Sequence, residues 1–217
     1  MEIRTQGYTV LKGVYTAEEI AAAREAVMAY HADHPMLDNA NGRFLPDFLT
    51  LPGLEAVASL KTAPRAVAAL EEAFGDQPYR FCGHSDISIN RVVSGWHKDI
   101  LNGPYVRYQR GDPWAPDYHI LKLGIYLQDH SENNDALQVV PGSHLRRGME
   151  TAGAIRLRPA LGDAVLFDQR ITRRGMERQV EGTRIMISFG FGAENDHTAG
   201  FEEGTRARQR DQLRSLG

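Results

Sequence analysis

The chain has 217 residues, of which 42% are hydrophobic, enough for one sizeable core and too little for two ordinary domains. With 25 Lys and Arg against 28 Asp and Glu, the net charge is −3, so the chain lacks the basic field that nucleic-acid binding requires. A mean hydropathy of −0.41, no long apolar run and a single cysteine, Cys82, predict a cytoplasmic protein with no membrane span, secretory signal or internal disulfide.

The first part of the chain, to about residue 78, is predicted to be mainly helical after one short strand. Gly7 to Leu11 is typical of a strand. Thr16 and Glu19 have the spacing of a capping box, which predicts the start of a helix that ends near His34. Residues 38–51 are expected to form an ordered loop that reaches a pocket, and two further helices are expected over 52–60 and 63–74.

From residue 79 to about 193 the hydrophobic pattern changes to that of short strands, which indicates an antiparallel barrel or sandwich. The long connection over 100–118 is rich in glycine, proline and aromatic residues and is expected to be a lid over a site. A C-terminal helix is expected over about 203–215, with its arginines on a solvated face. The expected strands are 79–81, 87–93, 119–127, 137–140, 154–157, 164–167 and 184–191, and the helix arginines are Arg206, Arg208, Arg210 and Arg214.

The most distinctive local pattern is Gly95-Trp-His-Lys-Asp99. On an extended strand His97 and Asp99 point to the same side, so that an imidazole and a carboxylate can bind one metal ion. An H-x-D pair alone is a weak signal, because it occurs by chance in many proteins. The motifs that follow it along the chain therefore decide its interpretation.

Two longer strings follow in order. Residues 137–144 read LQVVPGSH, residues 162–175 read GDAVLFDQRITRRG, and Arg184 then opens the run RIMIS. This order, over about residues 80–193, resembles the phytanoyl-CoA dioxygenase family of iron(II)- and 2-oxoglutarate-dependent oxygenases. The resemblance implies a mainly β fold with N-terminal helices, in which a double-stranded β-helix (a jelly-roll or cupin-like barrel) carries helices packed on one sheet.

The resemblance also implies a set of site residues. Fe(II) would be bound by His97, Asp99 and a second histidine on a late strand, which agrees with the two-histidine, one-carboxylate centre of such enzymes. The cosubstrate 2-oxoglutarate would be bound by Arg184, whose planar guanidinium matches a carboxylate, with help from Ser188 four positions later. Lys122 is a further candidate for the cosubstrate, the alternative being an outward surface lysine.

One position departs from the family pattern. Where the family has T-H-R-G, this chain has Arg173 in place of the second histidine, 11 residues before Arg184. Arginine stays protonated and does not bind metals. Iron is then held by two protein ligands, or another histidine replaces the missing one, or the guanidinium of Arg173 takes the place of the metal and pairs with Asp99. The candidates for a replacement histidine are His84, His119, His130 and His144.

We therefore expect one domain over residues 1–217, an oxidoreductase of the dioxygenase type that hydroxylates or otherwise oxidises a small organic molecule, with Arg173 altering its catalytic centre. The alternative is a metal-free family member that binds a small acid or catalyses a redox-neutral reaction. The substrate is expected beneath the 100–118 connection and to be anionic, whereas the oligomeric state stays open. The candidate substrate contacts are Tyr105, Arg107, Tyr108, Arg110 and Trp114.

Overall fold

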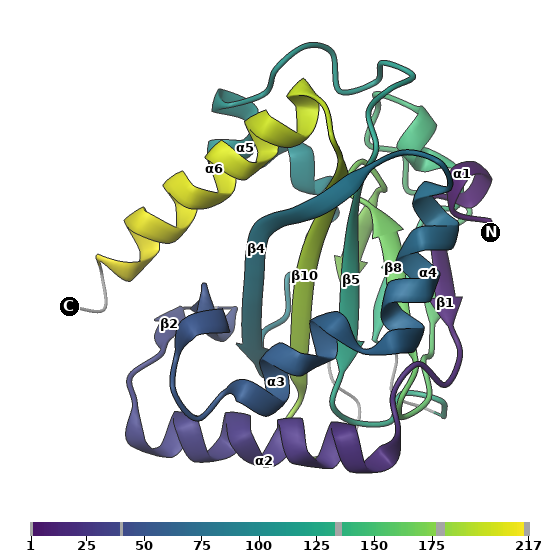
Figure 1. The fold of residues 1–217 in the computed structure, drawn as a ribbon. Coiled ribbons are helices and arrows are strands. Elements are labelled where there is room, and N and C mark those ends of the chain that lie inside the picture. Colours follow the sequence, from purple (N-terminus) through teal and green to yellow (C-terminus); the bar gives the residue numbers. More distant parts are fainter. Residues whose placement is uncertain (1, 40, 133–135, 177–180, 215–217) are drawn as a thin grey trace.

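The computed structural model describes residues 2–39, 41–132, 136–176 and 181–214, whose strands form two antiparallel sheets (Figure 1). The large sheet contains, in spatial order, β1 (Tyr8–Leu11), β8 (Ala164–Asp168), β5 (Ile120–Tyr126), β10 (Ile185–Ala193), β4 (Tyr79–Ile89), β3 (Gly42–Pro46) and β2 (Leu37–Asn39). The small sheet contains β7 (Ile155–Leu157), β6 (Leu137–Val139) and β9 (Arg173–Gly175). The prediction of a mainly β chain with helices is confirmed.

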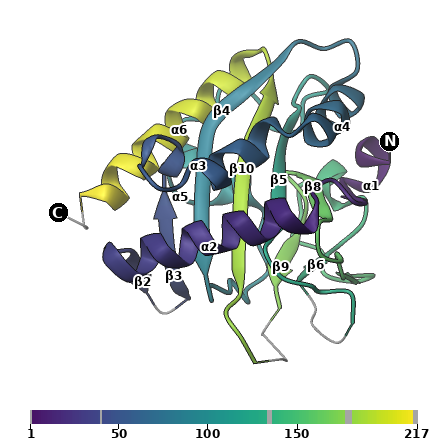
Figure 2. The same cartoon turned by 60° about the horizontal axis from the view of Figure 1, so that its bottom comes forward.

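Three helices, α2 (Ala17–Asp33), α3 (Glu55–Ser59) and α4 (Pro64–Phe74), cover the outer face of the large sheet, and α2 crosses its strands in Figure 2. The capping box at the start of α2 is present. The Thr16 hydroxyl accepts a hydrogen bond from the Glu19 amide at 3.2 Å, and the Glu19 carboxylate accepts one from the Thr16 amide at 2.8 Å. The helices and the outward side chains of the sheet bury the largest hydrophobic core.

A smaller hydrophobic core lies between the two sheets, on the inner face of the large one. It contains Tyr126, Val165 and Phe167 from the large sheet and Leu137 and Val139 from the small one. Because side chains alternate along a strand, the same strands also present polar side chains to this interior, and these build the candidate site.

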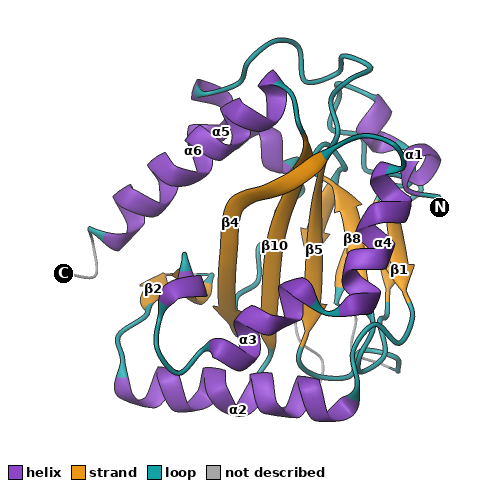
Figure 3. Cartoon of the chain, viewed as in Figure 1, coloured by secondary structure: helices purple, strands orange, loops and turns teal. Residues whose placement is uncertain are grey.

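The C-terminal helix α6 runs from Asp196 to Leu213 and packs on the short helix α5 (Gly103–Arg107), as the diagonal helix in Figure 3 shows. It begins earlier than the expected residue 203, because Asn195 caps it by accepting a hydrogen bond from the Thr198 amide at 3.1 Å. Gly200 lies close to the Tyr108 carbonyl, where a Cβ would be 2.3 Å from that oxygen. This close approach fixes the 100–118 connection against α6.

Other boundaries also differ from those expected. The expected runs 79–81 and 87–93 are replaced by one strand, β4, which ends at Ile89 and leaves residues 90–93 outside it. Gly83 has a φ of 75° where the register against β10 shifts. Residues 38–51 are not a loop, since β2 and β3 form a hairpin that extends the large sheet by pairing Leu45 with Ile87. The short helix α1 (Ile3–Gln6) and the strand β9 were not expected.

None of the helices in the described ranges combines the length and apolar character that crossing a membrane would take.

Candidate functional site

Alternation along three neighbouring strands brings four buried polar side chains to the interior between the sheets. They are His84 and Asp86 on β4, Ser188 on β10 and Lys122 on β5. Ser188 lies opposite Asp86 in the sheet register, and Lys122 lies opposite Gly190 of β10. Lys122 is 7% exposed, so the alternative of an outward surface lysine is wrong.

Asp99 is the centre of a dense ionic cluster. Arg173 donates through Nη2 to both carboxylate oxygens of Asp99, at 2.6 and 2.8 Å, and Lys122 donates through Nζ to Oδ2 at 2.8 Å. Burial alone would raise the pKa of Asp99, but the two neighbouring cations hold it well below its ordinary value. Asp99 is therefore an ionised carboxylate whose charge two protein cations already balance.

His97 faces the same point as Asp99. Its Nδ1 donates to the Gly95 carbonyl at 2.8 Å, and its Nε2 lies 3.4 Å from Oδ1 of Asp99. The backbones of His97 and Arg173 pair as an antiparallel bridge, with both N–H to carbonyl distances at 2.9 Å. The H-x-D residues and Arg173 thus meet, and the guanidinium of Arg173 is the group bound to Asp99.

A cavity of about 90 Å³ opens beside this cluster and is strongly cationic. Arg91, Lys122, Arg173 and Arg184 all line it, whereas Asp86 is its acidic lining residue. The Nε atoms of Arg91, Arg173 and Arg184 are buried and have no hydrogen-bond partner among the described residues. A buried donor without an acceptor is costly, so these three nitrogens are candidate donors to a ligand.

Arg184 lies at the start of β10 and is 6% exposed. Its Nη1 donates to the Met176 carbonyl at 2.9 Å and its Nη2 to the Ala136 carbonyl at 2.6 Å. The guanidinium also lies over the ring of Tyr126, 5.5 Å from its centroid. These contacts fix the plane of the guanidinium, whereas its Nε has no partner among residues 2–39, 41–132, 136–176 and 181–214.

Ser188 lines the same cavity and is oriented by His84. The Nε2 of His84 lies 3.1 Å from the Ser188 hydroxyl, and its Nδ1 lies 3.2 Å from the Tyr105 hydroxyl and 3.4 Å from Nη2 of Arg208. Burial lowers the pKa of His84 to about 3, so the ring is neutral. Because Arg208 only donates, Nδ1 is the acceptor and Nε2 carries the hydrogen, which leaves the Ser188 hydroxyl hydrogen free for the cavity.

Arg208 and Asp86 are functional neighbours that the sequence did not reveal. Arg208 comes from α6, has a side chain that is only 13% exposed, and donates to Oδ1 of Asp86 at 2.8 Å. It was expected on a solvated face with the other helix arginines, and this expectation is wrong for Arg208. The two-residue spacing of His84 and Asp86 on β4 was an available signal, but nothing in the local sequence separates Arg208 from Arg206 or Arg210.

The 100–118 connection packs against α6 and contributes no residue to the lining of the cationic cavity. Tyr105 is buried, stacks on Phe201 with ring centroids 4.7 Å apart, and contacts His84 through its hydroxyl at 3.2 Å. Arg110 pairs on the surface with Glu203 at 3.0 Å. The remaining candidate contacts lie elsewhere: Arg107 is exposed, Tyr108 is half-buried beside α6, and Trp114 lines a different cavity.

A sequence model of the phytanoyl-CoA dioxygenase (PhyH) family matches residues 3–173, more than half of the chain. The chain belongs to the phytanoyl-CoA dioxygenase family. No curated protein matches this sequence.

Several solved structures have a fold similar to that of this chain. The epimerase SnoN from nogalamycin biosynthesis, described as non-heme and α-ketoglutarate-dependent, is similar with a TM-score of 0.68 and 18% identity over 88% of this chain and 78% of its own. HygX from Streptomyces hygroscopicus, with nickel and 2-oxoglutarate bound, has a TM-score of 0.65 and 18% identity over 88% of this chain and 85% of its own. EvdO2 from Micromonospora carbonacea var. aurantiaca, complexed with 2-oxoglutarate, has a TM-score of 0.63 and 16% identity over 88% of each chain.

For a member of the phytanoyl-CoA dioxygenase family, the residues around Asp99 do not fit a divalent metal ion. His97 and Asp99 converge, but the position of the third ligand belongs to Arg173, and the carboxylate already accepts hydrogen bonds from two cations. A dication there would be repelled by both of them. The described part of the chain holds no group of three His, Cys, Asp or Glu side chains that could bind a metal.

None of the four candidate histidines completes the centre. His84 is held by Ser188 and Tyr105, and His130 lies 2.7 Å from Nε2 of Gln128. His119 and His144 line the other cavity. Three arrangements were considered for the position where the family pattern has a second histidine. In the structure, Arg173 occupies this position and pairs with Asp99.

Proposed function

We propose that this chain is a metal-free member of its family that binds 2-oxoglutarate, or a small dicarboxylate of similar length, in the cationic cavity and uses it in redox-neutral chemistry. We further infer that its two sheets form the double-stranded β-helix of the iron- and 2-oxoglutarate-dependent enzymes. The observation that carries the proposal is the pairing of Arg173 with both oxygens of Asp99. It balances the carboxylate without a metal ion and leaves the cavity cationic.

The charges around the cavity favour a dianion. Four cationic side chains line it, and the carboxylates close to them are Asp86 and Asp99. Asp86 is itself bound by Arg208 from behind the cavity. A dicarboxylate would supply the acceptors that the buried Nε atoms lack.

The residues that line the cavity contact the two ends of the ligand. Arg184 binds one carboxylate at the start of β10, and the Ser188 hydroxyl donates a hydrogen bond to the same group. Lys122 and Arg173 face the other end of the ligand, where they stabilise negative charge on its oxygens. Because the cations are fixed by Asp99 before the ligand arrives, little reorganisation is needed on binding.

The test is a calorimetric titration of 2-oxoglutarate into protein treated with a chelator. We expect saturable binding that added iron(II) does not strengthen, and binding at least about tenfold weaker for Arg184→Gln, since a hydrogen bond to a charged group contributes about 1.5–3 kcal/mol. Arg43→Gln, which removes an exposed arginine paired with Asp38, is the matched control. Binding that appears only with iron(II) would contradict the proposal.

A second candidate is the iron-dependent oxygenase itself, favoured by one observation. His97 and Asp99 still converge on a common point, and the Gly95 carbonyl orients the imidazole as it would for a metal ligand. Its test is the anaerobic titration of iron(II) with 2-oxoglutarate, followed by succinate formation in air, for this chain and for Arg173→His side by side. Succinate from the unchanged chain would establish the oxygenase and refute the metal-free proposal.

A further inference from the structure

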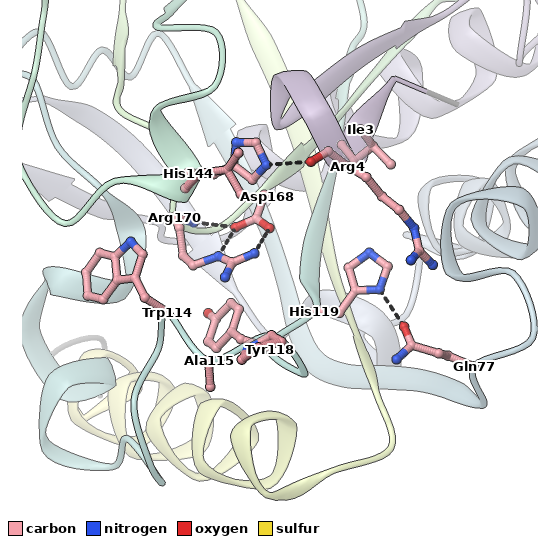
Figure 4. A pocket seen from close by; sticks show the side chains of 12 residues that line it. Ile3, Arg4, Gln77, Trp114, Ala115, Tyr118, His119, His144, Asp168 and Arg170 are labelled. Carbon is pink, nitrogen blue, oxygen red and sulfur yellow. Dashed lines mark hydrogen bonds and ion pairs between the residues drawn. The ribbon is translucent and has the colours of Figure 1, made fainter.

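A second cavity has a volume of about 240 Å³ (Figure 4). Asp168 of β8 lines it, whereas the preceding residue of that strand, Phe167, and its strand partner Lys122 line the cationic cavity, so the two cavities use adjacent residues but have separate linings. The cavity is lined by residues of α1, of the segment 114–119, of His144 and Leu145, and of the end of β8. No role in the proposed function involves it.

The two charged side chains on the floor of this cavity, Arg170 and Asp168, form an ion pair with each other. Arg170 donates through Nε and Nη2 to the two oxygens of Asp168, at 2.9 and 2.7 Å, and through Nη1 to the Pro113 carbonyl at 3.2 Å. Figure 4 shows this pair at the centre of the cavity, with Trp114 to one side and Arg4 to the other. The pair offers a ligand a neutral, flat surface.

The two histidines of the cavity are neutral. Burial lowers the pKa of His119 to about 4 and also lowers that of His144. The Nδ1 of His119 lies 2.9 Å from Oε1 of Gln77, and the Nε2 of His144 lies 3.1 Å from the Arg4 carbonyl. Neither ring therefore adds positive charge at neutral pH.

Trp114 and Tyr118 each bring a buried hydrogen-bond donor to the lining of this cavity. Within the part of the chain that the structure describes, neither the Nε1 of Trp114 nor the hydroxyl of Tyr118 has a partner, and Tyr118 is only 5% exposed. An indole N–H can only donate, so an acceptor atom on a ligand would satisfy it. At the other end, the Arg4 side chain is exposed and forms no ion pair within the described residues.

We propose that this cavity binds a small organic acid with two polar ends. Its carboxylate lies at the Arg4 end, a hydroxyl or carbonyl oxygen at the far end accepts hydrogen bonds from Trp114 and Tyr118, and a flat apolar body lies between them over the Asp168–Arg170 pair. The apolar lining, from Ile3, Ala115, Pro116 and Leu145, suits such a body.

The site adjoins the Asp99 cluster through Lys98. This buried side chain donates through Nζ to the carbonyls of Ser143 and Arg170, both at 2.7 Å. Arg170 belongs to the floor of the second cavity, and the segment that follows it carries Arg173. A ligand on this floor therefore contacts the connection that positions the guanidinium bound to Asp99.

The test uses three probes that differ at one end each: 4-hydroxybenzoate, benzoate, which lacks the far oxygen, and 4-hydroxybenzyl alcohol, which lacks the carboxylate. Calorimetry should rank 4-hydroxybenzoate first, with each of the others about tenfold weaker or more. Tyr118→Phe should weaken 4-hydroxybenzoate and leave benzoate unchanged, whereas Arg4→Gln should weaken both acids. The indole N–H resonance of Trp114, assigned with Trp96→Phe, should shift on binding.

The proposal would be overturned by the absence of saturable heat with 4-hydroxybenzoate, by equal binding of the alcohol, or by affinities that neither variant alters. The outcome is independent of the proposed function, because the same variants should bind 2-oxoglutarate in the cationic cavity as the unchanged chain does. Competition between 2-oxoglutarate and 4-hydroxybenzoate for one site would also contradict it.

Discussion

A single nitrogen of Arg173 lies within 2.8 Å of both carboxylate oxygens of Asp99, in the place where the family pattern would put an imidazole next to a metal ion. Lys122 completes the contacts from the opposite sheet. A carboxylate that would otherwise need a divalent cation is thereby neutralised by two monovalent ones. The replacement explains how a chain of this family keeps a buried Asp99 without an uncompensated charge.

Asp99→Asn should strongly destabilise the protein. The change leaves Arg173 and Lys122 buried without their counter-charge, and breaking a buried ion pair on one side costs about 3–5 kcal/mol. Urea unfolding followed by circular dichroism measures the loss. Asp38→Asn, which breaks the exposed pair with Arg43, should cost less than about 1 kcal/mol. Equal effects of the two changes would show that Asp99 is not the counter-charge we describe.

Arg173→His should create affinity for a divalent metal. It removes the guanidinium from Asp99 and supplies a second imidazole beside His97. Nickel(II) titrated by calorimetry should bind the variant at least about a hundredfold more tightly than the unchanged chain, a difference of about 2.8 kcal/mol. Arg173→Gln frees Asp99 without adding a ligand, so its affinity for nickel(II) should increase much less. If both variants bind nickel equally, repulsion alone excludes the metal and the missing imidazole does not matter.

The free energy of unfolding should fall as the pH drops below about 6.5. His84 should account for much of the loss between pH 6 and 4. The pKa of His84 is lowered to about 3 in the fold, so below its ordinary value near 6.5 the unfolded chain binds a proton that the folded chain does not. Each pH unit in that range then costs about 1.4 kcal/mol for this group. His84→Gln should flatten the slope of unfolding free energy between pH 6 and 4. An unchanged slope would mean that the ring is protonated in the fold.

The buried carboxylates of Asp86 and Asp99 affect the free energy of unfolding at lower pH than His84 does. The pKa of Asp86 and that of Asp99 both lie below their ordinary values because of Arg208 and of Arg173 with Lys122, although burial opposes the shift. Their contribution is complete above about pH 4 and is lost as the pH falls toward the folded pKa. In Asp99→Asn the remaining acid transition should therefore be shallower than in the unchanged chain, which the same unfolding series at pH 4 to 2 measures.

Arg208→Gln should weaken 2-oxoglutarate binding, although Arg208 lies outside the lining of the cavity. Without it Asp86 loses its partner and becomes a free negative charge facing the ligand, and His84 loses the contact that fixes its tautomer. We expect affinity to fall about tenfold or more. Arg206→Gln, on the same helix but in an exposed pair with Glu202, should leave affinity unchanged. Rescue by Arg208→Lys would show that charge suffices, whereas failure of that rescue would assign the effect to the planar geometry.

The sequence alone predicts what depends on local pattern. The spacing of Thr16 and Glu19 predicts the start of α2, and the two-residue spacing of His97 and Asp99 predicts that their side chains converge. The 11-residue spacing before Arg184 assigns Arg173 to the position of the missing histidine. These signals lie within one element or between fixed motifs, so no knowledge of packing is needed.

What the sequence did not predict depends on contacts between distant segments. The side chain of Arg208 is largely covered because α6 lies against β4, and its neighbours on the helix give no sign of this. The 100–118 connection has the composition of a lid, but Gly200 lets it approach α6 and remain there. The strand β3 forms because it pairs with β4, and β2 forms because it pairs with β3, whereas their own residues are typical of a loop.

The pairing of β1 with β8 has a consequence for how the chain folds. Tyr8 lies opposite Phe167, so one edge of the large sheet joins residues separated by most of the sequence. In the same sheet β4 pairs with β10, where Ile87 lies opposite Ile187, 100 residues further along the chain. Ordering such distant pairs costs loop-closure entropy before their contacts form, which slows folding. A chain emerging from the ribosome therefore cannot complete this sheet until β10 has been made, and until then its apolar strands depend on the helices of the N-terminal part for cover.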